Sequence, residues 1–397
     1  MASIEHQLQL RDGRLGPEKG GSGMFQDSIV IDGVGHSFDF SPSNCADSCP
    51  PEVFSAFVEE DWKGNTVVLE SNAPGFQKTL DEVRTAWSAE ETAQLYFEES
   101  DVDLLVYHEV VISGIFKNGI SPWERGAELK RANPDRVLLY AYVDPLLGPS
   151  QLEHMEERHA TGLVDGFKFY PTNGVFDEVT GLVETAFYDD RELVFPFFEK
   201  ARELGVHQIA VHKAMPVGPG RLDKDRVEDV SVAAAAFPDL TFEVVHSGWA
   251  FLEECIMQLQ VSPNVYANLE CTANIGVRQP RRLAEILGQF LRAGVGDRLL
   301  FGTGATATHP QPVVEALANL EMPQDLIDGY DYPELTPEIK KKIFGLNYAR
   351  LHGIDPQARL AKLATDDWHS RREAARVNKV GPWQAHRDNL AAAAATV

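Results

Sequence analysis

Short apolar runs alternate with longer amphipathic stretches along most of the chain. Eight runs are nearly continuous in apolar residues, which is typical of parallel strands buried on both faces. They cover residues 28–33, 102–107, 136–143, 166–170, 207–211, 241–245, 264–269 and 298–302. The stretches between them have helical periodicity, such as 193–204, which ends at Gly205. Repeated βα units with right-handed crossovers predict an α/β fold, the (β/α)8 TIM barrel.

Three segments exceed what a barrel needs. Residues 1–27 are polar and glycine-rich and predict an N-terminal arm. Residues 37–100 lie between the first two strands, and we expect them to form a cap insertion over the barrel mouth with a strand of its own at 66–70. Residues 356–397 predict a C-terminal helical tail, which leaves 28–355 as the metal-binding barrel domain.

The net charge of the chain disfavours some classes of binding partner. The 397 residues include 60 acidic and 36 basic side chains, a net charge of −24. Such a surface repels phosphate backbones and argues against nucleic acid. The sequence contains no run of 18 apolar residues that could span a membrane. Its four cysteines are too scattered to form a disulfide framework, so we expect a cytoplasmic enzyme. An anionic substrate would need a local basic patch, and candidates are Lys213, Arg221 and residues 278–282.

Histidines follow several of the predicted strands. His36, His108, His212 and His246 come at the ends of the first, second, fifth and sixth strands, and Glu270 comes at the end of the seventh. Active sites of such barrels are built from the C-terminal ends of several strands. Imidazole and carboxylate groups suit a divalent transition metal. The five residues are therefore predicted metal ligands.

Three further residues are predicted to take part in catalysis. Lys168, Tyr170 and Asn268 lie near strand ends, and Tyr170 and Asn268, together with Ser247, are placed to hydrogen-bond a substrate or an oxygen species. Lys168 is either a plain cation for an anionic substrate or a carbamylated bridge between two metals. Side-chain alternation puts Glu243 on the face opposite His246, which predicts that Glu243 supports the site or faces a helix.

Several motifs together resemble the amidohydrolase superfamily from about residue 30 to residue 354. They are the segment Asp32 to His36, Lys168 on strand four, His212 closing an apolar strand, His246-Ser247-Gly248, and the helix at 344–353. Two positions depart from the family pattern. Val34 stands where the strand-one motif has its first histidine, and Gly304 stands near the place of the strand-eight aspartate. That aspartate is ligand and general base in the family, so its absence disfavours ordinary hydrolysis.

The altered pattern resembles a smaller branch, the TIM-barrel non-haem diiron monooxygenases, which includes the diterpenoid hydroxylase of platensimycin and platencin biosynthesis. The similar segments are Gly35-His36 with residues 38–44, Tyr107-His108, residues 212–218 and residues 268–270. The resemblance implies two irons, dioxygen as co-substrate, and hydroxylation of a hydrophobic substrate carried as a coenzyme A thioester in antibiotic biosynthesis. An external reductase would supply electrons. Asp39 or His309 are further candidates to complete the ligand set.

Two other functions stay open at this point. One is a metal-dependent hydrolase or decarboxylase with a single zinc or manganese ion on His36, His212 and His246. The other is a barrel that has lost catalysis and binds a ligand or a partner. The aromatic residues of the cap suit a hydrophobic substrate and equally a homodimer interface.

Overall fold

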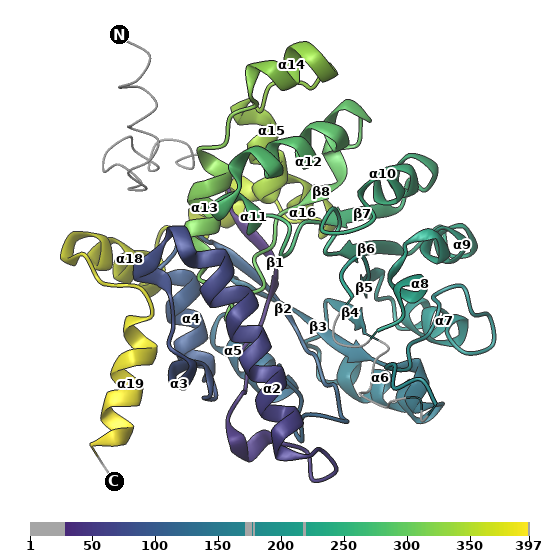
Figure 1. The fold of residues 1–397 in the computed structure, drawn as a ribbon, viewed down its shortest axis with the longest axis horizontal. Helices are drawn as coiled ribbons and strands as arrows, with labels where there is room; N and C mark the ends of the chain where they lie inside the picture. The colour runs from purple at the N-terminus through teal and green to yellow at the C-terminus, as the bar shows by residue number, and fades with distance from the viewer. Residues whose placement is uncertain (1–27, 171–176, 178, 217–219, 396–397) are drawn as a thin grey trace.

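A computed structural model describes residues 28–170, 177, 179–216 and 220–395, and the predicted N-terminal arm lies outside these residues. Eight parallel strands form one sheet in sequence order, surrounded by helices (Figure 1). Backbone hydrogen bonds from Gly33 to Phe301 (2.8 Å) and from Gly304 to Val34 (2.9 Å) join the last strand to the first. The predicted (β/α)8 barrel is therefore confirmed. The strands are β1 (Ile31–Gly35), β2 (Leu104–His108), β3 (Val137–Val143), β4 (Gly166–Phe169), β5 (Gln208–His212), β6 (Thr241–Val245), β7 (Val265–Asn268) and β8 (Leu299–Leu300).

The helices around the barrel begin and end where local chemistry favours it. In α4, the helix before β2, the Ser88 side chain accepts a hydrogen bond from the backbone N–H of Glu91. The Glu91 side chain accepts one from the backbone N–H of Ser88, which completes a capping box. The helix before β5, α7, ends at Glu203, and Gly205 two residues later has a φ of 72°, which suits a left-handed helix terminus. The surrounding helices include α4 (Ala89–Phe97), α5 (Trp123–Ala132), α6 (Ser150–Ala160), α7 (Phe195–Glu203), α9 (Glu228–Ala236), α10 (Leu252–Val261), α12 (Pro280–Arg292) and α13 (Pro310–Ala318).

Short helices fill the loops between these elements. They are α8 (Leu222–Asp225), α11 (Ile275–Arg278), α14 (Gln324–Tyr330), α15 (Pro337–Lys341) and α16 (Asn347–Leu351). A π-helical segment, Lys342–Leu346, joins α15 to α16, so the predicted late helix is continuous but irregular.

The barrel interior holds a polar network below the mouth. Glu243 is fully buried and accepts hydrogen bonds from the hydroxyls of Tyr140 and Tyr348, both at 2.6 Å. Glu243 thus lies inside the barrel, and the prediction that it faces a helix is wrong. The alternation argument failed because β6 ends at Val245, and His246, with a φ of 67°, turns back to the same side.

Helices and loops make up the cap, with isolated β-bridges such as that from Asp39 to Ala86. It contains α2 (Pro51–Asp61) and α3 (Leu80–Val83), and α2 continues directly into a π-helical segment, Trp62–Val68. The predicted strand at 66–70 is therefore wrong. The β-branched residues there favour a strand locally, but Thr66 is buried and its hydroxyl reaches the carbonyl of Ala307 (3.5 Å) in the loop after β8. This tertiary contact ties the cap to the barrel mouth.

The C-terminal tail folds back onto the cap. It forms α17 (Pro356–Leu363), α18 (Asp367–Asn378) and α19 (Gln384–Ala394), and the last two lie beside α4 in Figure 1. Trp383 is buried and its indole N–H donates to the carbonyl of Phe76 at 2.5 Å. His386 stacks on Trp87 and bonds Glu91 at 2.9 Å. Within the described residues, no helix combines the length and apolarity needed to cross a membrane.

Candidate metal centre

His36 and His108 lie together at the ends of β1 and β2. His108 is the last residue of β2, and its carbonyl accepts a hydrogen bond from His36 Nδ1 at 3.0 Å. This bond places the proton of the neutral His36 ring on Nδ1 and leaves Nε2 unprotonated, with a lone pair free to bind a metal. Burial lowers the pKa of His36 to about 4 and that of His108 well below its usual range. Both rings are therefore neutral, which metal binding requires.

His212 and His246 form a second pair at the ends of β5 and β6. His212 Nε2 donates to the carbonyl of Met215 (3.0 Å), which leaves its Nδ1 unprotonated. His246 Nε2 lies 2.9 Å from this Nδ1. The ring of Tyr170 packs at 4.1 Å against His212, and burial keeps the pKa of His212 well below its usual range. The two histidines thus direct nitrogen atoms at one point.

Glu270 takes the space that the residue at position 304 would otherwise fill. Gly304 has a φ of 70°, and a Cβ built on it would overlap Glu270 Oε1. The other carboxylate oxygen, Oε2, contacts His246 Nδ1. Burial alone would raise the pKa of Glu270, but the neighbouring His246 and the Cys271 thiol outweigh it and hold the pKa at about 2. An ionised carboxylate therefore fills the space beside Gly304, although it comes from the loop after β7.

The three predicted catalytic residues have different surroundings. Lys168 is buried, which lowers its pKa to about 8, and its Nζ lies 6.0 Å from the centre of the Tyr170 ring. Asn268 uses its side-chain amide within the protein: it donates to the carbonyl of Gly33 at 3.4 Å and accepts from the backbone N–H of Glu270 at 3.2 Å. Asn268 therefore positions Glu270.

Two further candidate ligands lie apart from this cluster. The Asp39 carboxylate accepts hydrogen bonds from the backbone and the hydroxyl of Ser41. His309 caps α13 through Nδ1 and faces Glu99 through Nε2 at 3.4 Å. Neither is brought to the strand-end histidines.

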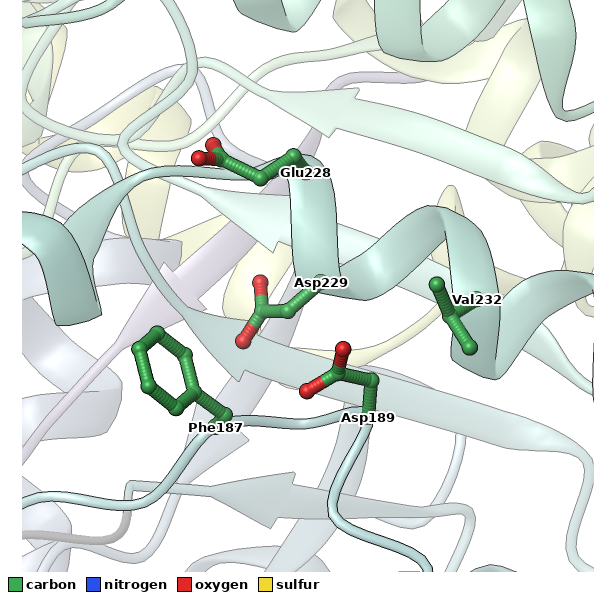
Figure 2. A pocket seen from close by; sticks show the side chains of 5 residues that line it. All are labelled: Phe187, Asp189, Glu228, Asp229 and Val232. Carbon is green, nitrogen blue, oxygen red and sulfur yellow. The ribbon is translucent and has the colours of Figure 1, made fainter.

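The basic candidates for an anion site are engaged elsewhere. Lys213 is buried and pairs with Asp229 at 2.7 Å. Asp229 also lines an outer pocket beside α9, shown in Figure 2 with Phe187, Asp189, Glu228 and Val232. This acidic pocket is separate from the metal centre, and its link to the site is structural: the ion pair anchors the residue that follows His212. Arg221 pairs with Asp223, and Arg281 pairs with Asp325.

The structure adds two residues that the sequence did not single out. Cys271 follows Glu270, and its thiol donates to Glu270 Oε1 at 2.9 Å. Asp61, at the end of α2, is brought from the cap to within electrostatic reach of Glu270; burial is the main reason that its pKa is raised to about 6. The only sequence signal for Cys271 was its place beside a predicted ligand, because its spacing matches no metal motif.

Buried polar atoms without hydrogen bonds test whether this cluster suits a metal. Within the described residues both ring nitrogens of the buried His108 lack one, and Nδ1 of His246 and Oε2 of Glu270 have only each other as partners. Buried polar groups are almost always satisfied, so the His108 nitrogens need an explanation. A divalent cation provides it, and the nitrogen and carboxylate donors suit a transition metal.

Comparison with known proteins identifies the family. The amidohydrolase family model matches residues 121–354, more than half of the chain. The chain therefore belongs to the amidohydrolase family, a superfamily of metal-dependent enzymes. No curated protein matches its sequence.

Solved structures share the fold at low sequence identity. A TIM-barrel protein from Bordetella bronchiseptica is 18% identical over 85% of this chain and 99% of its own, with a TM-score of 0.54. A 5-carboxyvanillate decarboxylase from Novosphingobium aromaticivorans, solved with manganese, is 12% identical over 84% of this chain and 99% of its own, with a TM-score of 0.51.

Proposed function

We propose that the chain is a metal-dependent hydrolase or decarboxylase with a divalent ion in the barrel mouth. The observation that carries the proposal is the position of Glu270. Its carboxylate fills the space at Gly304, so the group whose absence disfavoured hydrolysis is supplied from the neighbouring strand. The manganese-bound decarboxylase with the same fold is in line with this assignment.

The donors that would hold the metal are Nε2 of His36, Nδ1 of His212, His246 and the Glu270 carboxylate. A bound divalent ion supplies Lewis-acid polarisation of a substrate carbonyl or carboxylate. The surrounding residues have other tasks. Lys168 offers a buried positive charge to an anionic group of the substrate, and Asn268 keeps Glu270 in place. The cap excludes water from the mouth through its contacts with the loop after β8.

A diiron monooxygenase is the second candidate, and His108 favours it. Both nitrogens of this buried ring lack a hydrogen bond, and its pKa is lowered mainly by burial and further by the nearby Lys168, His36 and His246. A fourth imidazole beside three others gives more donors than one metal needs. A substrate bound to coenzyme A, dioxygen and an external electron donor belong to this candidate.

Metal content and dioxygen uptake separate the two candidates. The protein is expressed with iron, manganese and zinc all supplied, purified without chelators, and analysed for metals by mass spectrometry. We expect about one zinc or manganese ion per chain and no dioxygen uptake with a chemical reductant. About two irons per chain together with uptake would replace the hydrolase or decarboxylase by the monooxygenase. Absence of any bound metal would overturn both.

A further inference from the structure

The thiol of Cys271 lies in the same cluster as the proposed ligands. Cys271 is 9% exposed, and its Sγ is 2.9 Å from Glu270 Oε1. Its backbone has a φ of 58°, a region in which residues other than glycine are uncommon. The thiol is electrostatically coupled to Glu270, to Lys168 from β4 and to Asp61 from the cap, so it lies where barrel and cap meet over the mouth.

Two buried ligand atoms lie beside this thiol. His246 is 6% exposed and Glu270 is 4% exposed, and within the described residues His246 Nδ1 and Glu270 Oε2 contact each other and have no other hydrogen-bond partner. One ligand atom each from His246, Glu270 and Cys271 lies within 4.8 Å of the others. Imidazole, carboxylate and thiol ligand atoms gathered at one buried point are the donor types of a transition-metal site, so the geometry points to a cation.

We propose that Cys271 Sγ is a thiolate ligand of the metal, which gives the centre a nitrogen, oxygen and sulfur donor set. This inference rests on the proposed function, because it assumes a metal in the mouth. On binding, the S–H bond breaks, a sulfur–metal bond forms, and the proton passes to solvent. The hydrogen bond from the thiol to Glu270 Oε1 is lost in the same event, which frees that oxygen.

The donor set predicts which metals bind. Thiolate and imidazole donors favour zinc, cobalt and iron, whereas magnesium and calcium prefer oxygen donors alone. We therefore expect the centre to reject magnesium even at high concentration. Cys255 is an appropriate control because it is also a buried free cysteine, but it lies on α10 and bonds none of the proposed ligands.

The test uses cobalt as a spectroscopic probe in the full-length protein. Metal-free wild type, Cys271→Ser and Cys255→Ser are each titrated with Co²⁺, and absorption is recorded. Visible d–d bands report a cobalt ion held by the protein, and a near-ultraviolet thiolate-to-cobalt charge-transfer band reports sulfur ligation. We expect both in the wild type and in Cys255→Ser, and only the d–d bands in Cys271→Ser.

Affinity provides a second readout. Loss of an outer-shell partner alone typically weakens metal binding by roughly 10–100-fold, so Cys271→Ser should weaken cobalt binding by at least about 10-fold. Wild-type protein with d–d bands and no charge-transfer band would overturn the role of Cys271 while the metal centre stands. A charge-transfer band that persists in Cys271→Ser would overturn it too, because another cysteine would be the ligand. Absence of d–d bands in all three proteins would overturn the proposed function itself.

Discussion

The position of the Glu270 carboxylate predicts the effect of adding a single methyl group by the substitution Gly304→Ala. The added Cβ would overlap Glu270 Oε1, which is buried and accepts the hydrogen bond from Cys271. Two costs follow. Alanine at a φ of 70° costs about 1–2 kcal/mol. Displacing the carboxylate from its charge-assisted contacts costs about 1.5–3 kcal/mol more. We expect Gly304→Ala to lower the free energy of unfolding by about 3–4 kcal/mol.

Two further variants separate these costs. Gly294 has a φ of 76° and no atom within 4 Å of a Cβ built on it, so Gly294→Ala measures the backbone cost alone. In a Glu270→Ala background the overlap is gone, and Gly304→Ala should cost about as much as Gly294→Ala. The difference between the two backgrounds, about 2 kcal/mol, is the coupling between positions 270 and 304.

Urea denaturation of the metal-free proteins, followed by circular dichroism, measures all of these free energies. The metal-bound proteins provide a parallel measurement, since a displaced Glu270 should also weaken metal binding. Equal costs of Gly304→Ala in the presence and absence of the Glu270 carboxylate would show that the carboxylate does not occupy the space at 304. Glu270 would then be no replacement for a strand-eight aspartate.

Three other predictions concern separate parts of the molecule. His212→Ala should remove the bound metal, whereas His352→Ala, which changes a partly buried histidine that bonds Tyr140, should keep it. Elemental analysis that finds equal metal in both variants would remove His212 from the centre. Lys168→Met should keep the wild-type metal content if Lys168 is a cation for the substrate, and a loss of metal would instead favour a carbamylated bridge. The pKa of Glu91 is held at about 2, since its hydrogen bonds from His386 and Ser88 outweigh burial, so its charge stabilises the fold above its unfolded pKa of about 4.5. In urea titrations at pH 6, Glu91→Gln should therefore be less stable than wild type by roughly 1–3 kcal/mol. This difference in the free energy of unfolding should shrink as the pH falls towards 2. A difference that does not change with pH would contradict the role of the Glu91 charge.

The fold could be predicted from the sequence because buried parallel strands give continuous apolar runs. The ends of the strands were less certain. Apolar patterning stopped before His108 and His212, which are the last residues of β2 and β5 in the structure. A polar residue at the end of a strand carries no apolar signal, although this is the position where barrels place their ligands. The histidines were found because of their residue type, not their periodicity.

Side-chain direction was harder to predict at the points where strands become loops. Alternation holds only while the backbone stays extended, and His246 and Cys271 have φ values of 67° and 58°. The direction of Glu243 was therefore predicted wrongly, and Cys271 was not considered. The π-helical segment Trp62–Val68 is a similar case, because contacts with the loop after β8 overrode its local preference for a strand.

The Glu270 carboxylate could not have been placed from the sequence, because its position depends on two glycines in the loop after β8. A Cβ on Gly302 would lie 3.1 Å from the Cβ of Glu270, and a Cβ on Gly304 would overlap its carboxylate. A side chain at 304 and the observed position of Glu270 therefore exclude one another. Read alone, Gly304 indicates a lost ligand and a barrel without catalysis. Together with Glu270 it indicates a carboxylate moved from one strand to its neighbour, with the ionised group kept beside His246. The absence of an aspartate at 304 is thus no argument against catalysis in this chain.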